Sequence, residues 1–556
     1  MNQIQKKLYK LLIEVDEICQ KHNIVYYLAA GGALGAIRNG GFLPWDDDLD
    51  LYITRDNWEK LKLVMKEEVP DNREFVCTEY TELYCNPIGR YVDKETTLMM
   101  KSQLLCGKCC GLLVEFFIMD PMPTDEEGKW RHRTYMKAYT EVLSPYFLLN
   151  REVFAHNIDF DYKLYNKYYW LSKLIGTKKV LNMLLDKFAR FPEEKCQEFC
   201  MRWGQRTVIF PKAMFGDAKK VKFEEREFPL VEYPEKTFRV GYGDDWMYVP
   251  EGDNQISHDL SNDLEEPFET YVNLYMSFLN EKKLMKAYKK RKRIAIKGLQ
   301  KREAYERKYA FLCASLYAEN FLRSAMTVEQ LKELLVNKNF KRLNQQLAPF
   351  YQAQADVRLK ANDILIPLPD EYIYIAVMNY ILQGYYYKAS KIMAYREKVG
   401  SELSEDMLEA KRLIEFCRAL SIAVYDDKNV TAVEAILSGG PKYSELLDFK
   451  KAELWVLYKT ASTKNEFEKL IKRAQALLDV YEADGEIQRF AGYGFYQLGN
   501  REKAEELYLE AVKNTRNGFV WREARELLGI DAYQIVDFVQ DCVGGEDSEE
   551  EDEEDE

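Results

Sequence analysis

The sequence has no apolar run long enough to span a membrane, and its start, MNQIQKKLYKLL, lacks the apolar stretch and cleavage site of a signal peptide. We therefore expect a cytoplasmic protein with no membrane span. Its hydrophobic fraction of 47% and charged fraction of 31% are ordinary for a soluble globular protein. A chain of 556 residues is too long for one core and predicts at least two domains.

An excess of basic charge is also missing. The net charge is −13, but the segment Glu546–Glu556 alone carries ten carboxylates, and without it the net charge is −3. Binding to a nucleic-acid backbone needs a basic footprint, so nucleic acid is excluded as the main partner. The basic cluster Lys289–Arg293 is typical of a solvated helix face. We expect residues 541–556 to form a disordered acidic tail.

Disulfide patterning is absent as well. The eleven cysteines are scattered, which fits a reducing compartment. Cys106, Cys109 and Cys110, with Cys85 upstream, have a spacing that allows a thiolate zinc site. Only one C-x-x-C pair is present, and cysteine is a common buried residue, so zinc binding stays open.

Glycine becomes scarce from about Glu265, and helical periodicity then continues to about Gly529. Two stretches in this region, Tyr380–Ala389 and Tyr496–Ala504, are similar to each other. The second resembles a tetratricopeptide repeat, with a turn glycine between two helices and a lysine-alanine pair on the next helix. We predict an α-helical, tetratricopeptide-like domain over residues 265–540, with a non-repeating helical bundle as the alternative.

What the chain does contain is a glycine pair after an apolar run. Ile24–Ala30 reads as a buried strand that leads into Gly31 and Gly32, whose missing Cβ atoms let a phosphate approach the backbone closely. Gly35–Arg38 looks like the start of a short helix, whose first amides would favour an anion. Arg38 either contacts donor phosphates or forms an ion pair with the acidic loop that follows.

That acidic loop contains three consecutive aspartates, 46–48, and then Asp50. Asp48 and Asp50 alternate with Leu49 and Leu51, so on a strand the carboxylates would share one face and the leucines would face the core. Adjacent carboxylates repel unless a cation lies between them, and Mg²⁺ or Mn²⁺ carrying nucleotide phosphates is the usual solution. A solvated acidic turn is the alternative, and the apolar alternation argues against it.

A third carboxylate lies in a later apolar run. Gly111–Met119 reads as a central strand with Glu115 alone in its middle. A buried carboxylate without a partner is costly. Glu115 therefore faces water on an edge strand, pairs with a lysine or arginine, or joins Asp48 and Asp50 as the third acid of the site. In that last case it completes the metal site or acts as a base.

Together these residues resemble the LicD family of the nucleotidyltransferase superfamily. The match runs through Ala30–Gly32, Leu34–Arg38 and Gly41–Asp50. Gly32 stands where the family often has Thr or Ser, and Asn39 where it often has His. Glu115 stands where the family usually has Asp, and the apolar residues, Asp120 and Pro121 that follow also fit the family pattern. The resemblance implies an α+β fold, with a mixed sheet and flanking helices over residues 1–264. Within this range, residues 130–203 are rich in aromatic residues and lysine, and we predict that they form a helical insert.

A second segment, Phe228–His258, also resembles LicD proteins. Tyr242, Asp245 and Trp246 are matching positions, and we expect them to form a wall that contacts the acceptor. His258 could be a catalytic base, although a lone histidine at the end of a segment is more often structural.

The resemblance implies a metal-dependent transferase that moves phosphocholine, or a related phospho-alcohol, from a CDP-linked donor to a sugar hydroxyl of a cell-surface glycan. The predicted catalytic and metal-binding residues are Asp48, Asp50 and Glu115, and the donor phosphates are assigned to Gly31, Gly32 and Arg38. The alternatives are a nucleotide-sugar glycosyltransferase and a helical-repeat scaffold with an inactive front domain. The helical part would recruit a protein partner or the acceptor glycan, or mediate self-association.

Overall fold

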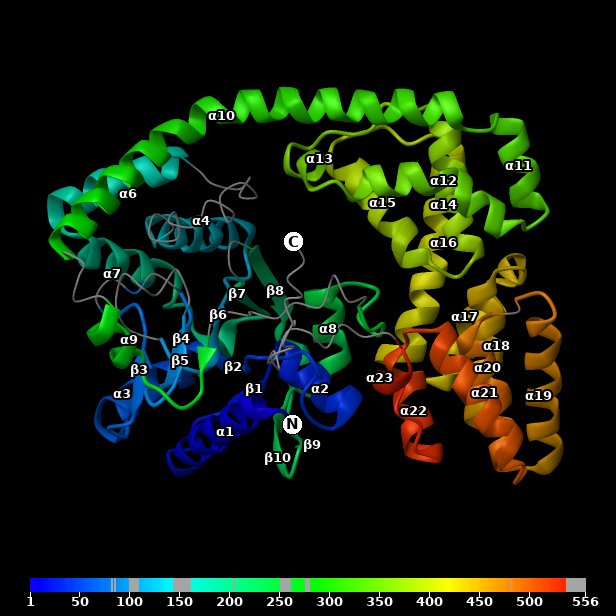
Figure 1. Cartoon of the computed structure of the whole chain (residues 1–556), viewed down its shortest axis with the longest axis horizontal. Coiled ribbons are helices and arrows are strands. Elements are labelled where there is room, and N and C mark those ends of the chain that lie inside the picture. Colours follow the sequence, from blue (N-terminus) through cyan, green and yellow to red (C-terminus); the bar gives the residue numbers. More distant parts are fainter. Residues whose placement is uncertain are drawn as a thin grey trace, which may run out of the picture.

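A computed structural model describes residues 1–81, 84, 87–99, 110–143, 162–203, 206–250, 262–275, 281–481 and 483–536. Its first part combines a sheet with helices, and its second part is helical (Figure 1). The predictions for Cys85, Cys106, Cys109, His258 and the tail 541–556 lie outside the described residues. No helix among the described residues is long and apolar enough to cross a membrane.

The main sheet contains seven strands within the described residues. Its order is β1-β2-β6-β4-β3, and β7 and β8 extend it beyond one end of β6. The strands are β1 (Tyr26–Leu28), β2 (Asp50–Thr54), β3 (Arg73–Val76), β4 (Gly89–Asp93), β6 (Leu113–Pro121), β7 (Glu198–Trp203) and β8 (Arg206–Pro211). Only the β2–β6 pair is parallel among these described strands. The predicted mixed sheet and the central position of the Gly111–Met119 strand are therefore confirmed.

Alternation along β2 and β6 gives the sheet two different faces. Leu51 and Phe116 belong to the core that also contains residues of helices α1 (Gln3–Lys21) and α3 (Arg55–Glu68). Tyr52 and Phe117, one residue later on each strand, belong to a separate cluster. The predicted core position of the leucines is confirmed.

The start of β2 differs from the prediction. The strand begins at Asp50, so Asp48 lies in the preceding loop rather than two positions earlier on the same strand. Backbone pairing starts here because the amide of Ala29 donates to the carbonyl of Asp50 (2.9 Å) and the amide of Glu115 donates to the carbonyl of Leu49 (2.8 Å).

The glycine pair also lies elsewhere than predicted. Helix α2 spans Ala30–Asn39, so Gly31 and Gly32 form its first turn instead of preceding it. Ala30 has a positive φ of 42°, an uncommon conformation for alanine, and this turns the chain directly from β1 into the helix.

The insert contains α4 (Glu126–Leu143), α6 (Tyr162–Ile175) and α7 (Thr177–Phe188). Its last residues were expected to be helical, but Glu198–Trp203 is strand β7. This segment is a strand because it pairs with the end of β6 at Asp120 and with the whole of β8. The remaining elements of the first part are β5 (Thr97–Leu98), β9 (Lys219–Phe223), β10 (Arg226–Leu230), α8 (Pro234–Tyr242), β11 (Asn262–Asp263) and α9 (Phe268–Tyr275).

The second part confirms the predicted helical region. Its helices are α10 (Glu281–Ser324), α11 (Val328–Val336), α12 (Phe340–Ala355), α13 (Val357–Ala361), α14 (Asp370–Leu382), α15 (Tyr386–Lys398), α16 (Glu405–Ser421), α17 (Val430–Gly439), α18 (Leu447–Thr460), α19 (Lys464–Leu478), α20 (Gly485–Gln497), α21 (Arg501–Asn514), α22 (Gly518–Leu528) and α23 (Ala532–Ile535). The two similar stretches are α14–α15 and α20–α21, which turn at Gly384 (φ 78°) and Gly499 (φ 79°). Their tetratricopeptide-like character stays a prediction.

The two parts meet at α8 and at residues 243–250, which follow it. We call residues 243–250 the junction segment. The amide of Val249 donates to the carbonyl of Arg516 (2.7 Å), and the amide of Gly518 donates to the carbonyl of Met247 (2.9 Å). Arg239 of α8 binds both carboxylate oxygens of Asp426, at 2.6 and 2.8 Å. The first part therefore reaches the helical part through hydrogen bonds and a buried ion pair.

Candidate functional site

The predicted third carboxylate lies beside the acidic loop. Asp50, at the start of β2, pairs in register with Glu115 of β6, and directly paired residues point to the same face of a sheet. On the other side, Arg90 of β4 pairs in register with Glu115 and forms an ion pair with it. The structure thus brings Glu115 next to Asp50 as expected, and also gives it the arginine partner that was the structural alternative.

Asp50 is buried among other acids. It is only 7% exposed, and its Oδ1 atom has no hydrogen-bond partner among the described residues. Burial raises the pKa of Asp50 well above its usual range, and the negative charges of Asp48, Glu115 and Asp46 raise it further, while Arg90 opposes them. The charges of three other carboxylates therefore all disfavour ionisation of Asp50.

Asp46 explains why position 31 is a glycine. A Cβ atom on Gly31 would lie 2.4 Å from Oδ2 and 2.9 Å from Oδ1 of Asp46. The space that was predicted to admit a phosphate is used here by a carboxylate at the start of α2, where helix amides favour negative charge. The Asp46 backbone is held by a bond from Nε2 of buried Gln5 to its carbonyl (3.1 Å). No sequence motif marks Gln5, and we did not predict its role.

Arg38 contacts the junction segment. It is 2% exposed and donates to the backbone carbonyls of Trp246 and Tyr248, the latter at 3.2 Å. Burial lowers the pKa of Arg38 to about 10. The residue braces the junction segment, because α2 and that segment lie against each other.

The expected acceptor wall is split by the structure. Tyr242 lies near the acids: its pKa is raised first by desolvation and then by Tyr52, Asp46, Asp50 and Asp48.

The other two wall residues face the helical part. Asp245 forms an ion pair with Lys391 of α15 at 2.7 Å. Trp246 is 2% exposed and donates through Nε1 to Asp426 at 3.3 Å. Of the three, Tyr242 is therefore the residue placed to border a reaction at the acids.

The fit of a divalent cation can be judged from these groups. In the described part of the chain, no group of three or more His, Cys, Asp or Glu side chains is already arranged to hold a metal ion. The acids near Asp50 are nevertheless oxygen donors, two of them buried and two partly buried, whose negative charges disfavour ionisation of Asp50, and this chemistry suits Mg²⁺ or Mn²⁺. Asp48 and Asp50 are the residues that fit the cation best, because Arg90 holds Glu115.

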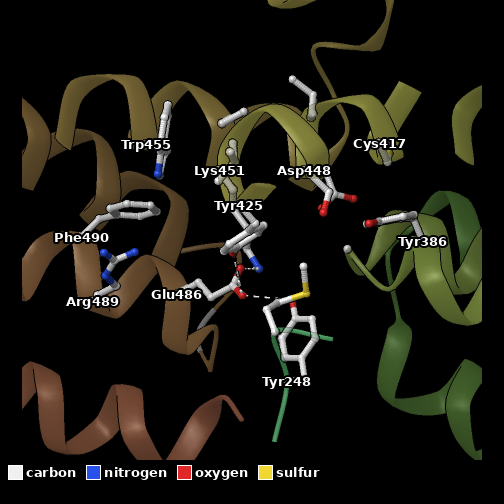
Figure 2. Close-up of a pocket in the computed structure, with 16 residues that line it drawn as sticks. Tyr248, Tyr386, Cys417, Tyr425, Asp448, Lys451, Trp455, Glu486, Arg489 and Phe490 are labelled. Carbon is white, nitrogen blue, oxygen red and sulfur yellow. Dashed lines mark hydrogen bonds and ion pairs between the residues drawn. The ribbon is translucent and has the colours of Figure 1, made fainter. Parts of the chain in front are cut away.

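A cavity of about 50 Å³ lies at the junction, and its lining does not include the four acids. Figure 2 shows Tyr248 in this cavity, and its hydroxyl donates to Glu486 at 3.0 Å. Lys451 binds Asp484 (2.7 Å) and Glu486 (2.9 Å). Oδ2 of Asp448 has no hydrogen-bond partner within the described residues, and burial raises the pKa of Asp448 to about 7. The junction therefore encloses one carboxyl group that is costly to ionise.

The chain is similar to several known proteins. Over 250 residues, the chain is 23% identical to the lipopolysaccharide cholinephosphotransferase LicD of Haemophilus influenzae. This match covers 43% of this chain and 89% of that protein. It is 38% identical over 58 residues to an uncharacterized protein of Rickettsia prowazekii, covering 10% of this chain and 22% of that one. An uncharacterized protein of Rickettsia typhi is 42% identical over 50 residues, and this match covers 9% of this chain and 16% of that protein.

The match to a family is confined to the region of the acids. The family described as LicD/FKTN/FKRP, nucleotidyltransferase domain, matches residues 23–92, which contain the glycine pair, the acidic loop, β2 and Arg90. The N-terminal part of this chain therefore carries a LicD/FKTN/FKRP nucleotidyltransferase domain.

Proposed function

We propose that this protein transfers phosphocholine, or a related phospho-alcohol, from a CDP-linked donor to a sugar hydroxyl of a cell-surface glycan. The observation that carries the proposal is the buried Asp50 carboxylate, crowded by Asp48, Glu115 and Asp46 at the start of α2. The nucleotidyltransferase domain match and the similarity to a cholinephosphotransferase support it.

Each residue of the site has a role in this proposal. Asp48 and Asp50 would hold Mg²⁺ or Mn²⁺, which when bound neutralises the charge of the donor pyrophosphate. The donor phosphates would be held by this cation, because the Asp46 carboxylate already fills the space beside Gly31 at the first turn of α2. The acceptor oxygen attacks the phosphorus of the transferred group, CMP leaves, and the hydroxyl proton passes to Glu115, which Arg90 orients.

The proposal is tested by supplying donors to the purified full chain. CDP-choline and UDP-sugars are incubated separately with a glycan acceptor, with Mg²⁺ or with a chelator, and the released nucleotide is measured. We expect CMP release from CDP-choline that depends on Mg²⁺. Asp48→Asn and Asp50→Asn should each lower it by about a hundredfold or more, because several kcal/mol of charge stabilisation is lost. Asp56→Asn, an exposed carboxylate on α3, is the matched control and should keep wild-type turnover.

Binding gives a second readout. A ligand that binds only the folded chain raises its melting temperature, so CDP-choline with Mg²⁺ should do so for the wild type and not for Asp50→Asn. Consumption of a UDP-sugar instead would indicate a glycosyltransferase. If neither donor is bound or consumed, the transferase proposal is wrong.

A non-catalytic scaffold is the second candidate, and the Glu115–Arg90 ion pair favours it. In that case the arginine has replaced a cation as the partner of the carboxylate, and the helical part carries the function by binding a protein or a glycan. Full activity with CDP-choline would exclude this candidate.

A further inference from the structure

Helix α10 has 44 residues and runs along one edge of the molecule, from the part that contains the sheet to the helical part (Figure 1). Its C-terminal half packs near α12 and α13. Between residues 305 and 324, the buried residues are Ala310, Ala314, Ala318 and Phe321, each at most 4% exposed. Their spacing of three or four residues places them on one side of the helix. Three of the four are alanines, so this inward side is narrow.

The opposite side of the same half is apolar and exposed. Tyr305, Leu312 and Leu316 are 71%, 56% and 58% exposed. At about 100° per residue, these three positions form one stripe about 180° from the buried alanines. A surface helix normally turns its polar side outward, whereas here the outward residues are larger and more apolar than most of the inward ones. An exposed apolar stripe of this kind marks an interaction surface.

The charge of α10 indicates what that surface binds. The helix contains 14 basic and 4 acidic residues, a net charge of +10, although the whole chain carries −13. All of this net charge lies in residues 281–302, and the half that carries the stripe, residues 303–324, is neutral. Arg307 and Lys308, both exposed, follow Tyr305 closely. Basic residues combined with an apolar stripe are typical of a helix that lies on an anionic lipid surface, where each Lys or Arg adds attraction.

Two other occupants fit less well. A second copy of the chain that packed its α10 in parallel along the first would bring two +10 segments, residues 281–302, side by side, and like charges repel. The acidic segment Glu546–Glu556 has the right charge but contains no apolar residue that could cover the leucines. An anionic bilayer offers both an acyl boundary and phosphate groups.

We propose that the outer face of α10, centred on Tyr305, Leu312 and Leu316, docks on an anionic membrane surface. The helix lies parallel to the membrane plane, its exposed apolar side chains enter the boundary between headgroups and acyl chains, and the positive net charge of residues 281–302 attracts the anionic lipids. The proposal concerns peripheral binding and does not depend on the catalytic proposal above.

Cosedimentation of the full chain with lipid vesicles tests it. We expect the protein to bind vesicles of phosphatidylcholine mixed with phosphatidylglycerol and not to bind vesicles made only of phosphatidylcholine. High salt should release the bound protein. The double variant Leu312→Ser/Leu316→Ser should bind about a hundredfold more weakly, because each buried leucine contributes about tenfold. Val336→Ser is the matched control, since Val336 is 80% exposed on α11 and lies outside the stripe. Unfolding curves establish that both variants fold.

Three results would overturn the proposal. The wild type fails to sediment with the mixed vesicles, or the double variant binds them as well as the wild type does. Alternatively, light scattering shows a wild-type dimer that the same double substitution dissociates, which would assign the stripe to a second copy of the chain.

Discussion

Replacing Gly31 with alanine tests the packing at the centre of the site. The new Cβ would lie 2.4 Å from Oδ2, 2.9 Å from Oδ1 and 3.0 Å from Cγ of Asp46. The neighbouring Gly32 gives a matched control in the same helical turn, because its nearest neighbour among the described residues is Cγ of Leu49, at 4.0 Å. Neither glycine has a positive φ, so backbone strain does not distinguish the two substitutions.

The magnitudes follow from this difference. Alanine is favoured over glycine in a helix by about 0.5–1 kcal/mol, a gain that both variants share. Overpacking costs about 1–3 kcal/mol, and only Gly31→Ala pays it. Asp46 cannot move away freely, because Gln5 and the turn from Leu43 hold its backbone. We therefore expect Gly32→Ala to be slightly stabilised and Gly31→Ala to unfold more easily than Gly32→Ala by about 1–3 kcal/mol.

Denaturant unfolding, monitored by tryptophan fluorescence, measures the stability of each variant. CMP release from CDP-choline measures its turnover. Displacing Asp46 changes the negative charge next to Asp50, so Gly31→Ala should also lose at least about tenfold in turnover while Gly32→Ala keeps it. Equal stability and equal turnover in the two variants would refute the close approach of Asp46 to Gly31.

Two further predictions concern the junction. Burial raises the pKa of Asp448 from 3.8 to about 7, so between these values the native chain keeps a proton that the unfolded chain releases, and stability falls as the pH rises. In the wild type, the free energy of unfolding should fall by about 2–4 kcal/mol between about pH 5 and about pH 8, and Asp448→Asn should remove this fall. A wild-type free energy of unfolding that does not change over this range would contradict the assignment. Arg239→Ala leaves Asp426 buried without its cation and should cost about 3–5 kcal/mol in urea unfolding. The control Lys428→Ala breaks a more exposed pair with Glu235 and should cost less than about 1 kcal/mol; similar losses in both would argue against a buried ion pair at Arg239.

Local patterns in the sequence were enough to predict the central strand, the core-facing residues beside the acids and the helical second part. The apolar run around Glu115 predicted the central strand, because only a strand covered on both faces is apolar throughout. The alternation of Leu49 and Leu51 with acids predicted which residues face the core. Helical periodicity after Glu265 predicted the second part of the chain, since that signal repeats over many turns.

Partners that are distant in the sequence could not be obtained in this way. Whether Glu115 meets a cation or an arginine depends on strand order, which places β4 on one side of β6 and β2 on the other. Arg38 was expected at a phosphate or at the acidic loop, but its partners are backbone carbonyls at positions 246 and 248. Nothing near Arg38 in the chain signals that contact.

The same limit applies to the glycine pair and to the predicted wall. A glycine pair between a strand and a helix shows that something approaches the backbone, while the packing of the 41–48 loop decides that Asp46 does so. Asp245 and Trp246 were grouped with Tyr242 because all three match positions of one LicD-like segment, yet Asp245 and Trp246 contact charged groups of the helical part. Sequence periodicity reports the neighbours of a residue along one element, whereas the identity of a buried charge's partner is set by how separate elements pack.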